Sequence, residues 1–353
     1  MGNKIIIMGP YPPPAGGVAT FVNKLYSNLK GKDTLLWAYT DNINFKENQY
    51  KINGKLELVP LLLKYSFKAK IVDSWGYFLE YPSTGKLSII NIFSFYALKK
   101  LLRFKWIKII HDGTLPERYK SFSKRQSWIF QKSLNTMDDI VVVNPSLKDW
   151  LINYIGINKT ITVSKSLLPI DNAFEDKKDA LKLNNIYDYI ISTVGAFTAD
   201  YGIKHIVEAV EKIRNEKNIN ICLIILSSSF TQDEEYKNNL LADRNWIIVS
   251  EDADTKNVIQ IFKQSKVFVR ACRYESYGLS KVEALMCGVP VICTNTGETR
   301  GMVTYEFGDV ETLKQKICEV LDKDSRMNEY WVSKYKEEAY ENLNKILGII
   351  KGS

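Results

Sequence analysis

The chain has 353 residues, of which 45% are hydrophobic and 25% are charged, a composition typical of a folded globular protein. No run approaches the roughly 18 apolar residues of a membrane-spanning helix, and the apolar stretch near the start is too short for a secretory signal, so we expect a cytoplasmic protein. Because single cores stop growing at about 250 to 300 residues, the length predicts two domains.

The charge is distributed unevenly. Residues 1–170 hold 24 Lys and Arg against 11 Asp and Glu, a net charge of +13, whereas the remaining residues hold 24 against 29. This asymmetry predicts an anionic partner for the first half, such as a membrane phospholipid, a phosphorylated lipid or nucleic acid. An AT-rich genome, which encodes Lys and Asn wherever the surface tolerates them, would produce the same bias without a partner.

Cysteine and histidine spacing predicts neither a disulfide framework nor a metal site. The five cysteines show no CxxC spacing, and the chain has two histidines, His111 and His205. The cysteines are Cys222, Cys272, Cys287, Cys293 and Cys318.

Apolar runs of strand length alternate with amphipathic helical stretches from end to end, the pattern of parallel sheets covered by helices. Strands are predicted over 5–8, 35–39, 71–75, 106–110, 140–143, 190–194, 221–226, 246–249, 267–269 and 289–293. Helices are predicted over 18–29, 147–154, 203–217, 258–264 and 310–321, with one or two more over 327–351. The pattern predicts two doubly wound α/β domains, residues 1–170 and 171–353, with a seam near 167–176 and last helices that can pack back on the first domain.

In open α/β sheets, ligands bind beyond the carboxyl ends of the strands, so the residues after each predicted strand are site candidates. "GPYPPPAGGVATFV" follows the first strand, and Gly16 and Gly17 allow close backbone approach to a ligand at a helix start that favours anions. The segment matches neither the P-loop nor the GxGxxG pattern. His111 and Asp112 follow the fourth strand, where a histidine is as often a structural hydrogen-bonding group as a ligand contact.

"TVGAFTADYGIKHIVEAV" follows the first strand of the second half. Gly195 permits a tight turn, Gly202 opens the next helix and Lys204 lies in its first turn, which together suit a diphosphate. We expect His205, inside the amphipathic helix, to pack or to lie at the surface.

Two aspartates in "SEDADTKNV", Asp252 and Asp254, form a DxD pattern that a metal could use. They precede a helix expected to start near Thr255, where acidic residues complement the helix dipole. We therefore interpret them as capping residues.

The stretch "RYESYGLSKVEALMCGVPVICTNTG" places Glu275 on a loop and Glu283 inside an apolar helix. "SKVE", Ser280 to Glu283, matches a capping box, which would explain Glu283 but leaves Glu275 unexplained. Carboxylates accept hydrogen bonds from hydroxyls, while helix N–H groups and Lys281 attract phosphates. These groups together suit a nucleotide sugar.

This stretch resembles the E-x7-E segment of retaining family-4 glycosyltransferases, which have the GT-B fold of two Rossmann-like domains facing across a cleft. The glycine loop, the strand-end His111, "DDIVVVNPSLKDWL", "VGAFTADYGIKHIVEAV" and "FGDVETLKQKI" match the family in order. The resemblance implies an N-terminal acceptor-binding domain and a C-terminal domain that binds the nucleotide sugar.

The resemblance also implies residue roles and partners. Glu275 would bind donor-sugar hydroxyls near the reacting carbon, Glu283 the ribose, Gly17 the donor phosphates or sugar, and His111 would lie beside the sugar. The expected catalytic residues are Glu275 and His111, and the expected donor-binding residues are Gly16, Gly17, Gly195, Lys204, Arg273, Ser276, Tyr277, Gly278, Leu279, Lys281 and Glu283. Transfer would proceed with retention, without a metal or other cofactor, from a UDP- or GDP-sugar to a glycan or polyprenyl-diphosphate-linked acceptor in surface polysaccharide assembly.

One departure from the family concerns the donor diphosphate. The family pattern Gly-Arg-Leu-x-x-x-Lys-Gly is replaced by "GAFTADYG", so Ala196 and Tyr201 stand where the family has cations. Lys204, Arg273, Lys281 or Arg300 could substitute. The alternative is a catalytically degenerate GT-B scaffold that binds a glycan or a protein partner; nucleic-acid binding has no recognisable module in the sequence.

Two segments of the cationic half mix basic and large apolar residues: "NIFSFYALKKLLRFKWIKII" and "RYKSFSKRQSWIFQKSL". Interfacial helices have this composition, and each basic residue near an anionic leaflet adds about 1 kcal/mol. They predict a peripheral location at the inner face of the cell membrane. A core-facing apolar stripe with a solvated basic edge is the alternative.

Overall fold

The computed structural model describes residues 4–12, 16–29, 31, 33–39, 47–52, 54–75, 86–169, 174, 186–228, 233–323 and 329–352. The chain forms two compact units. Unit 1 comprises Met1–Leu167 and Asn342–Ser353, and unit 2 comprises Leu168–Glu341. The division falls at the start of the seam predicted over 167–176, most of which lies outside the described residues.

Unit 1 contains a parallel seven-stranded sheet in the order β3-β2-β1-β4-β5-β6-β7. The order reverses between β1 and β4, which makes their carboxyl ends the topological switch point of this sheet. The strands are β1 (Ile5–Pro10), β2 (Thr34–Tyr39), β3 (Gln49–Lys51), β4 (Lys70–Asp73), β5 (Lys105–Ile110), β6 (Asp139–Val142) and β7 (Ile161–Val163).

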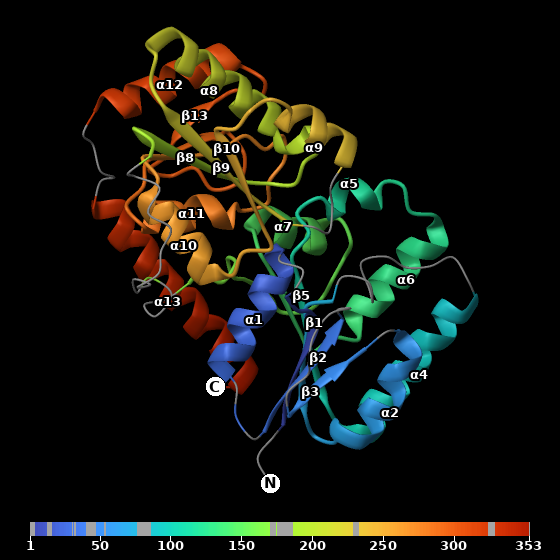
Figure 1. Ribbon diagram of the computed structural model, residues 1–353. Coiled ribbons are helices and arrows are strands. Elements are labelled where there is room, and N and C mark those ends of the chain that lie inside the picture. Colours follow the sequence, from blue (N-terminus) through green and yellow to red (C-terminus); the bar gives the residue numbers. More distant parts are fainter. Residues whose placement is uncertain are drawn as a thin grey trace. The chain divides into compact units, whose positions relative to one another are not determined.

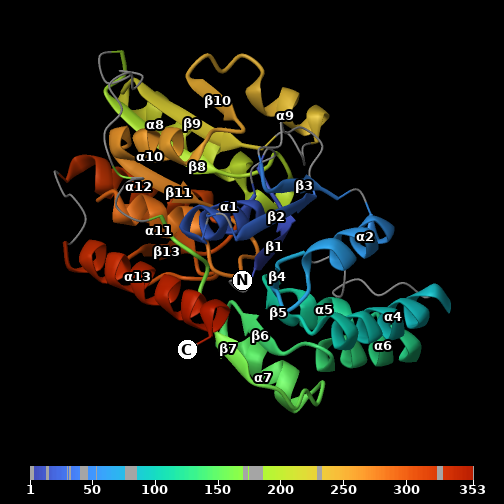
Figure 2. The same ribbon diagram turned by 90° about the horizontal axis from the view of Figure 1, so that it is seen from below.

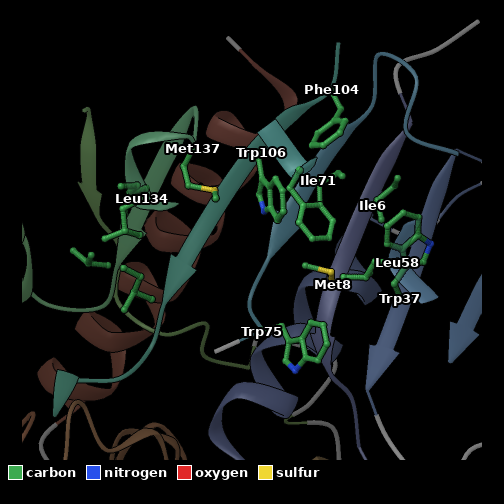
Figure 3. Packing of buried hydrophobic residues seen from close by; sticks show 14 of the residues in the cluster. Ile6, Met8, Trp37, Leu58, Ile71, Trp75, Phe104, Trp106, Leu134 and Met137 are labelled. Carbon is green, nitrogen blue, oxygen red and sulfur yellow. The ribbon is translucent and has the colours of Figure 1, made fainter. Parts of the chain in front are cut away.

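Helices cover both faces of this sheet, with α1 on one side of β1 and β2 and with α2, α4 and α6 on the other (Figure 1). Helices α4 and α6 lie side by side in both ribbon views (Figures 1 and 2). Trp37, Trp106 and Phe104 project from the sheet region into one apolar cluster, which α2, α4, α5, α6 and α7 complete (Figure 3). The helices are α1 (Gly17–Leu29), α2 (Lys55–Tyr65), α4 (Lys86–Leu102), α5 (Leu115–Tyr119), α6 (Lys124–Asn135) and α7 (Pro145–Asn153).

Unit 2 contains a parallel six-stranded sheet in the order β10-β9-β8-β11-β12-β13, whose switch point lies between β8 and β11. Its central strands are buried on both faces, which explains why they appear in the sequence as continuous apolar runs. The strands are β8 (Tyr189–Val194), β9 (Ile221–Ser227), β10 (Ile247–Glu251), β11 (Val267–Arg270), β12 (Val291–Thr294) and β13 (Val303–Tyr305).

Two apolar layers enclose the sheet of unit 2. Helices α8 and α12 lie side by side on one face, and α10 and α11 cover the other (Figure 1). Successive side chains of a strand point to opposite faces of the sheet. In the strand Val267–Arg270, Val267 and Val269 therefore pack in the first layer and Phe268 in the second. The helices are α8 (Ile203–Lys217), α9 (Glu234–Leu241), α10 (Thr255–Gln264), α11 (Leu279–Met286), α12 (Val310–Asp322) and α13 (Glu329–Lys351), with a 3-10 turn at Ala199–Tyr201.

The two doubly wound α/β units confirm the predicted architecture, and all ten predicted strands are present. The prediction missed β3, β7 and β13, which have three residues each and lie at sheet edges, because so short a segment shows no periodicity.

Asp254 caps α10 by accepting a hydrogen bond from the N–H of Asn257 at 2.7 Å, which confirms its predicted capping role. Helix α13 spans the end of unit 2 and the beginning of the last segment of unit 1.

Candidate active site

The carboxyl ends of β8 and β11 bring together the loop that follows each strand. The two strands pair in parallel, with Val267 opposite Ile191 and Phe268 opposite Ser192, so Arg270 ends β11 beside the end of β8. Gly202, at the end of the loop after β8, has a left-handed φ of 59°, and a Cβ there would lie 2.2 Å from the carbonyl oxygen of Ala271 in the loop after β11. Glycine at 202 therefore permits the close approach of the two loops.

Glu275 lies in the loop after β11 and is held by two cations. Its Oε1 accepts hydrogen bonds from Nη2 and Nε of Arg270 at 2.7 and 3.0 Å, and its Oε2 lies 3.1 Å from Nζ of Lys281. The side chains of Arg270, Glu275 and Lys281 are 11%, 9% and 0% exposed. The three residues form a buried cluster with two positive charges and one negative charge, which we call the Arg-Glu-Lys cluster.

The two cations keep Glu275 ionised. Burial opposes ionisation of the carboxyl group, but the charges of Arg270 and Lys281 outweigh it, so the pKa of Glu275 lies below its ordinary value. An ionised carboxylate only accepts hydrogen bonds, which suits a partner that carries hydroxyl groups.

The Arg-Glu-Lys cluster connects the loops after three strands. Arg270 donates through Nη1 to the carbonyl oxygen of Val194 at the end of β8, and Lys281 donates through Nζ to the carbonyl oxygen of Thr296 after β12. Gly278 makes room for the cluster, because a Cβ there would lie 2.6 Å from Oε2 of Glu275. The position of the Glu275 carboxylate is thus fixed from both sides.

The predicted capping box at Ser280–Glu283 is wrong. Helix α11 begins at Leu279 with Gly278 as its N-cap, so Ser280 already lies inside the helix. Gly278 adopts a left-handed φ of 85°, which lets the helix start earlier than the Ser-x-x-Glu pattern indicates. Glu283 is buried in the middle of α11, and its burial needs another explanation than capping.

The predicted donor-binding residues in the loop after β11 differ in exposure. Ser276 is exposed, whereas Tyr277 is buried and Leu279 packs against the apolar layer of α10 and α11. Arg273 is exposed, forms a 3.2 Å ion pair with Asp200 and lies over the ring of Phe307. Arg273 therefore already has a carboxylate partner.

The loop after β8 carries the two residues that depart from the family pattern. Ala196 is buried, and the ring of Tyr201 covers Gly195, whose Cβ would lie 3.0 Å from Cδ1 of Tyr201. The guanidinium of Arg270 lies 5.1 Å from the centre of the Tyr201 ring, a cation–π contact. Arg270, which the sequence analysis did not select, thus reaches the loop in which cations were missing.

Two further predicted residues of this segment lie apart from the cluster. Lys204 is exposed and lies 3.8 Å from Glu208, one turn further along α8. His205 packs edge-on against Phe307, which confirms that it is a packing residue.

In unit 1, Gly16 and Gly17 are exposed at the start of α1, and no atom lies within 4 Å of a Cβ built on either. The N–H of Thr20 donates to the carbonyl oxygen of Gly16 at 2.8 Å, which closes the first turn of α1. The backbone at both glycines is therefore open to a ligand. Nearby residues 13–15 lie outside the described residues.

His111 follows β5, as predicted, and its ring packs edge-on against Phe21 of α1. Its Nε2 is buried and has no hydrogen-bond partner among the described residues. Burial, with the positive charge of Lys108 as a second cause, lowers the pKa of His111 to about 3. His111 is therefore neutral at physiological pH, with a ring nitrogen able to bond to a ligand hydroxyl.

Asp112 has a structural role. Its Oδ1 accepts hydrogen bonds from the N–H and the hydroxyl of Thr114 at 2.8 and 2.7 Å, and Arg118 pairs with its other oxygen. Within the described residues, no group of three or more His, Cys, Asp or Glu side chains could hold a metal ion.

Comparisons with known proteins show similarity to glycosyltransferases. Residues 174–338 match the family model of glycosyl transferases group 1, which covers most of unit 2. An uncharacterized glycosyltransferase of Methanocaldococcus jannaschii is 22% identical over 306 residues, 77% of each chain. N-acetyl-alpha-D-glucosaminyl L-malate synthase of Bacillus anthracis is 24% identical over 219 residues, 58% of this chain and 56% of the relative.

Solved structures share the fold along the whole chain. HepE of Anabaena, crystallised with UDP and glucose, superposes with a TM-score of 0.71 at 14% identity and covers 100% of both chains. WaaG, a glycosyltransferase involved in lipopolysaccharide biosynthesis, superposes with a TM-score of 0.66 at 12% identity over 99% of this chain and 100% of WaaG. Residues 174–338 are therefore similar to the group 1 glycosyl transferases, and the chain has the two-sheet GT-B fold.

Proposed function

We propose that the protein is a retaining glycosyltransferase that moves a sugar from a UDP- or GDP-sugar to a glycan or lipid-linked acceptor in surface polysaccharide assembly, without a bound metal. The observation that carries this proposal is the position of Glu275. It is a buried, ionised carboxylate at the switch point of the sheet, inside the domain that matches the transferase family.

The chemistry of the donor explains the remaining residues. Glu275 accepts hydrogen bonds from hydroxyls of the donor sugar, and Glu283, eight positions later and buried in α11, binds the ribose. Neutral His111 bonds to a sugar hydroxyl through Nε2. The crystal structure of HepE with UDP and glucose supports a nucleotide-sugar donor for a chain with this fold.

Transfer with retention needs no protein nucleophile in this proposal. The bond from the anomeric carbon to the phosphate oxygen breaks while a bond to the acceptor oxygen forms on the same face of the sugar. The acceptor proton passes to the departing phosphate oxygen. Stabilisation of the leaving diphosphate by fixed positive charge is then the main electrostatic contribution to the rate.

Release of nucleoside diphosphate from a panel of UDP- and GDP-sugars tests the proposal. We expect Glu275→Gln to lower the rate by about 100-fold or more while the protein stays folded, because it removes the charge of a carboxylate held at the reacting sugar. Glu211→Gln is the matched control, since Glu211 also accepts two hydrogen bonds from an arginine, Arg244, away from the switch point. Undiminished turnover by Glu275→Gln would contradict the proposed role.

A lipid-linked acceptor and a peripheral membrane location form part of the proposal. The N–H of Lys68, three residues after the end of α2, donates a hydrogen bond of 2.8 Å to the carbonyl oxygen of Leu102 at the end of α4. Their edge exposes large apolar residues beside lysines, with Lys68 over the ring of Phe67 and Lys100 over that of Tyr96. We call this the α2–α4 edge; its exposed apolar residues are Leu63, Phe67, Phe93, Tyr96 and Leu101.

The α2–α4 edge has the composition of an interfacial membrane surface, in which aromatic and apolar side chains enter the headgroup region and lysines bind anionic lipid. Within the described part of the chain, no helix is both long and apolar enough to cross a bilayer. Attachment by this edge would place unit 1 at a leaflet that holds a lipid-linked acceptor.

A further inference from the structure

The donor diphosphate of the proposed reaction needs positive charge, and three of the four predicted substitutes for the missing cations each have a carboxylate of their own. Lys204 lies beside Glu208 and Arg273 beside Asp200. Arg300 donates to Glu298 and also to Glu338, so two carboxylates surround one guanidinium. In each of these groups of side chains, the positive charge is matched by at least one carboxylate.

The Arg-Glu-Lys cluster has one positive charge in excess. Arg270 and Lys281 share the single carboxylate of Glu275, and the ion pairs of the described residues place no second carboxylate on either cation. Burial raises the pKa of the neighbouring Cys272 thiol to about 11, so this group adds no negative charge. The carbonyl oxygens of Val194 and Thr296 accept hydrogen bonds from the cluster but carry no full charge.

An unbalanced charge in a buried position is costly, because desolvation is compensated only by an opposite charge or a bound ligand. The cluster is almost fully buried, and it lies at the switch point where ligands of open α/β sheets bind. Its excess charge therefore indicates an anion as the missing partner.

We propose that Arg270 and Lys281 supply the positive charge that binds the donor's diphosphate, in place of the cations absent at Ala196 and Tyr201. This inference rests on the proposed function, since it takes the anion to be the diphosphate of a nucleotide sugar. Glu275 then has two roles: it accepts hydroxyls of the sugar and holds both cations in place.

The geometry of Arg270 fits this role. Of its five N–H donors, two bond to Glu275 and one to Val194, which leaves two for a phosphate without loss of the Glu275 contact. Its guanidinium lies against the Tyr201 ring, in the loop where the family pattern places its cations. Arg270 thus reaches from β11 to the loop after β8, which has lost its own charges.

The test measures binding of inorganic pyrophosphate, UDP, GDP, uridine and guanosine by calorimetry, with circular dichroism and thermal unfolding as checks of folding. Arg270→Met and Lys281→Met each remove one positive charge. We expect each to weaken binding of pyrophosphate and of the preferred nucleoside diphosphate by at least about tenfold, the effect of one charge-assisted hydrogen bond, while nucleoside binding is unchanged.

Glu275→Gln should change the affinity for the diphosphate in the opposite direction. It raises the excess charge of the cluster, so we expect binding of the diphosphate to become several-fold tighter while sugar transfer is lost. Arg244→Met is the control, because Arg244 also donates two hydrogen bonds to one carboxylate, that of Glu211, elsewhere in unit 2, and its loss should leave binding unchanged.

If Arg270→Met does not fold, the comparison of Glu275→Gln with the double variant Arg270→Met/Glu275→Gln replaces it, because these two proteins differ only in Arg270. Equal diphosphate affinity with and without Arg270 would overturn the inference and leave the proposed function intact. Failure of the wild-type protein to bind any of the phosphate compounds would overturn the proposed function itself.

Discussion

Arg270 and Glu275 form a buried ion pair in which both guanidinium hydrogen bonds end on the same carboxylate oxygen, Oε1, at 2.7 and 3.0 Å. The other oxygen, Oε2, faces Lys281 at 3.1 Å. Such an arrangement fixes the plane of the carboxylate before any ligand arrives. In enzymes, groups held in this way act without the reorganisation that water would need.

Replacing Glu275 with Ala should destabilise the protein by about 3–5 kcal/mol, because two buried cations lose their counter-charge. Glu211→Ala removes a more exposed partner of Arg244 and should cost less than about 1 kcal/mol. The measurement is urea-induced unfolding at neutral pH. Equal destabilisation by the two substitutions would show that the cluster contributes no more than a surface pair.

The same substitution should change the pH dependence of stability. The pKa of Glu275 is lowered in the folded protein from an ordinary value of 4.5, so the stabilisation is present above that value and is lost as the pH falls through the folded pKa. The difference in free energy of unfolding between wild type and Glu275→Ala should therefore shrink as the pH falls below 4.5. A difference that stays constant over this range would contradict the lowered pKa.

Gly202 and Gly288 both have left-handed backbone conformations, with φ of 59° and 78°, but they differ in surroundings. A Cβ at 202 would lie 2.2 Å from the carbonyl oxygen of Ala271, whereas a Cβ at 288 would meet no atom within 4 Å. Gly288→Ala should cost about 1–2 kcal/mol for the conformation alone. Gly202→Ala should cost about 1–3 kcal/mol more, because the loops after β8 and β11 must separate. Thermal unfolding of the two variants gives the comparison, and similar losses would mean that the loops can separate freely.

His111 should stay neutral across the physiological range. With a pKa of about 3 in the folded protein and 6.5 ordinarily, the unfolded chain binds more protons between these values, so the free energy of unfolding should fall as the pH falls below 6.5. The contribution is up to about 1.4 kcal/mol per pH unit. Imidazole NMR signals should show no titration of His111 between pH 5 and 8, and His111→Gln should be less sensitive to acid.

Binding through the α2–α4 edge should depend on its lysines. The double variant Lys68→Ala/Lys100→Ala should lose about 2 kcal/mol of affinity for vesicles containing phosphatidylglycerol, roughly 1 kcal/mol for each lysine. Lys212→Ala/Lys217→Ala, on the surface of unit 2, is the matched control. Cosedimentation at low and high salt measures the effect, and wild-type binding that is absent at low salt would contradict the peripheral location.

The architecture was predictable because the burial of apolar side chains in strands and helices also produces the strongest patterns in the sequence. Buried strands such as Ile221–Ser227 are continuous apolar runs, and α8 has the predicted bounds because Gly202 starts it and its apolar residues repeat with helical spacing. The edge strands β3, β7 and β13 were not predicted, because a segment of three residues is too short to show periodicity. The Ser280–Glu283 pattern misled because the left-handed backbone of Gly278 allowed α11 to start earlier.

The candidate site was predictable only in part. Glu275 stood out as a carboxylate without a structural explanation, and Lys281 as a cation near it. Arg270 was missed because a charged residue at the end of an apolar strand looks solvent-exposed when only the sequence is known. Its spacing of five residues from Glu275, in the loop that follows a buried strand, is the one signal that could have revealed it.

Helix α13 contributes residues to both units, so unit 1 needs residues that come after all those of unit 2 in the chain. Its residues from Asn342 onward belong to unit 1, where Ile346 and Ile350 are buried and Lys345 donates to the carbonyl oxygen of Val163 at 2.6 Å. During synthesis, unit 2 has all its residues before unit 1 does, although unit 1 begins first. A fragment that stops at Leu167 would therefore expose apolar surface that a later segment covers, and the two units cannot be separated by a single cut in the chain.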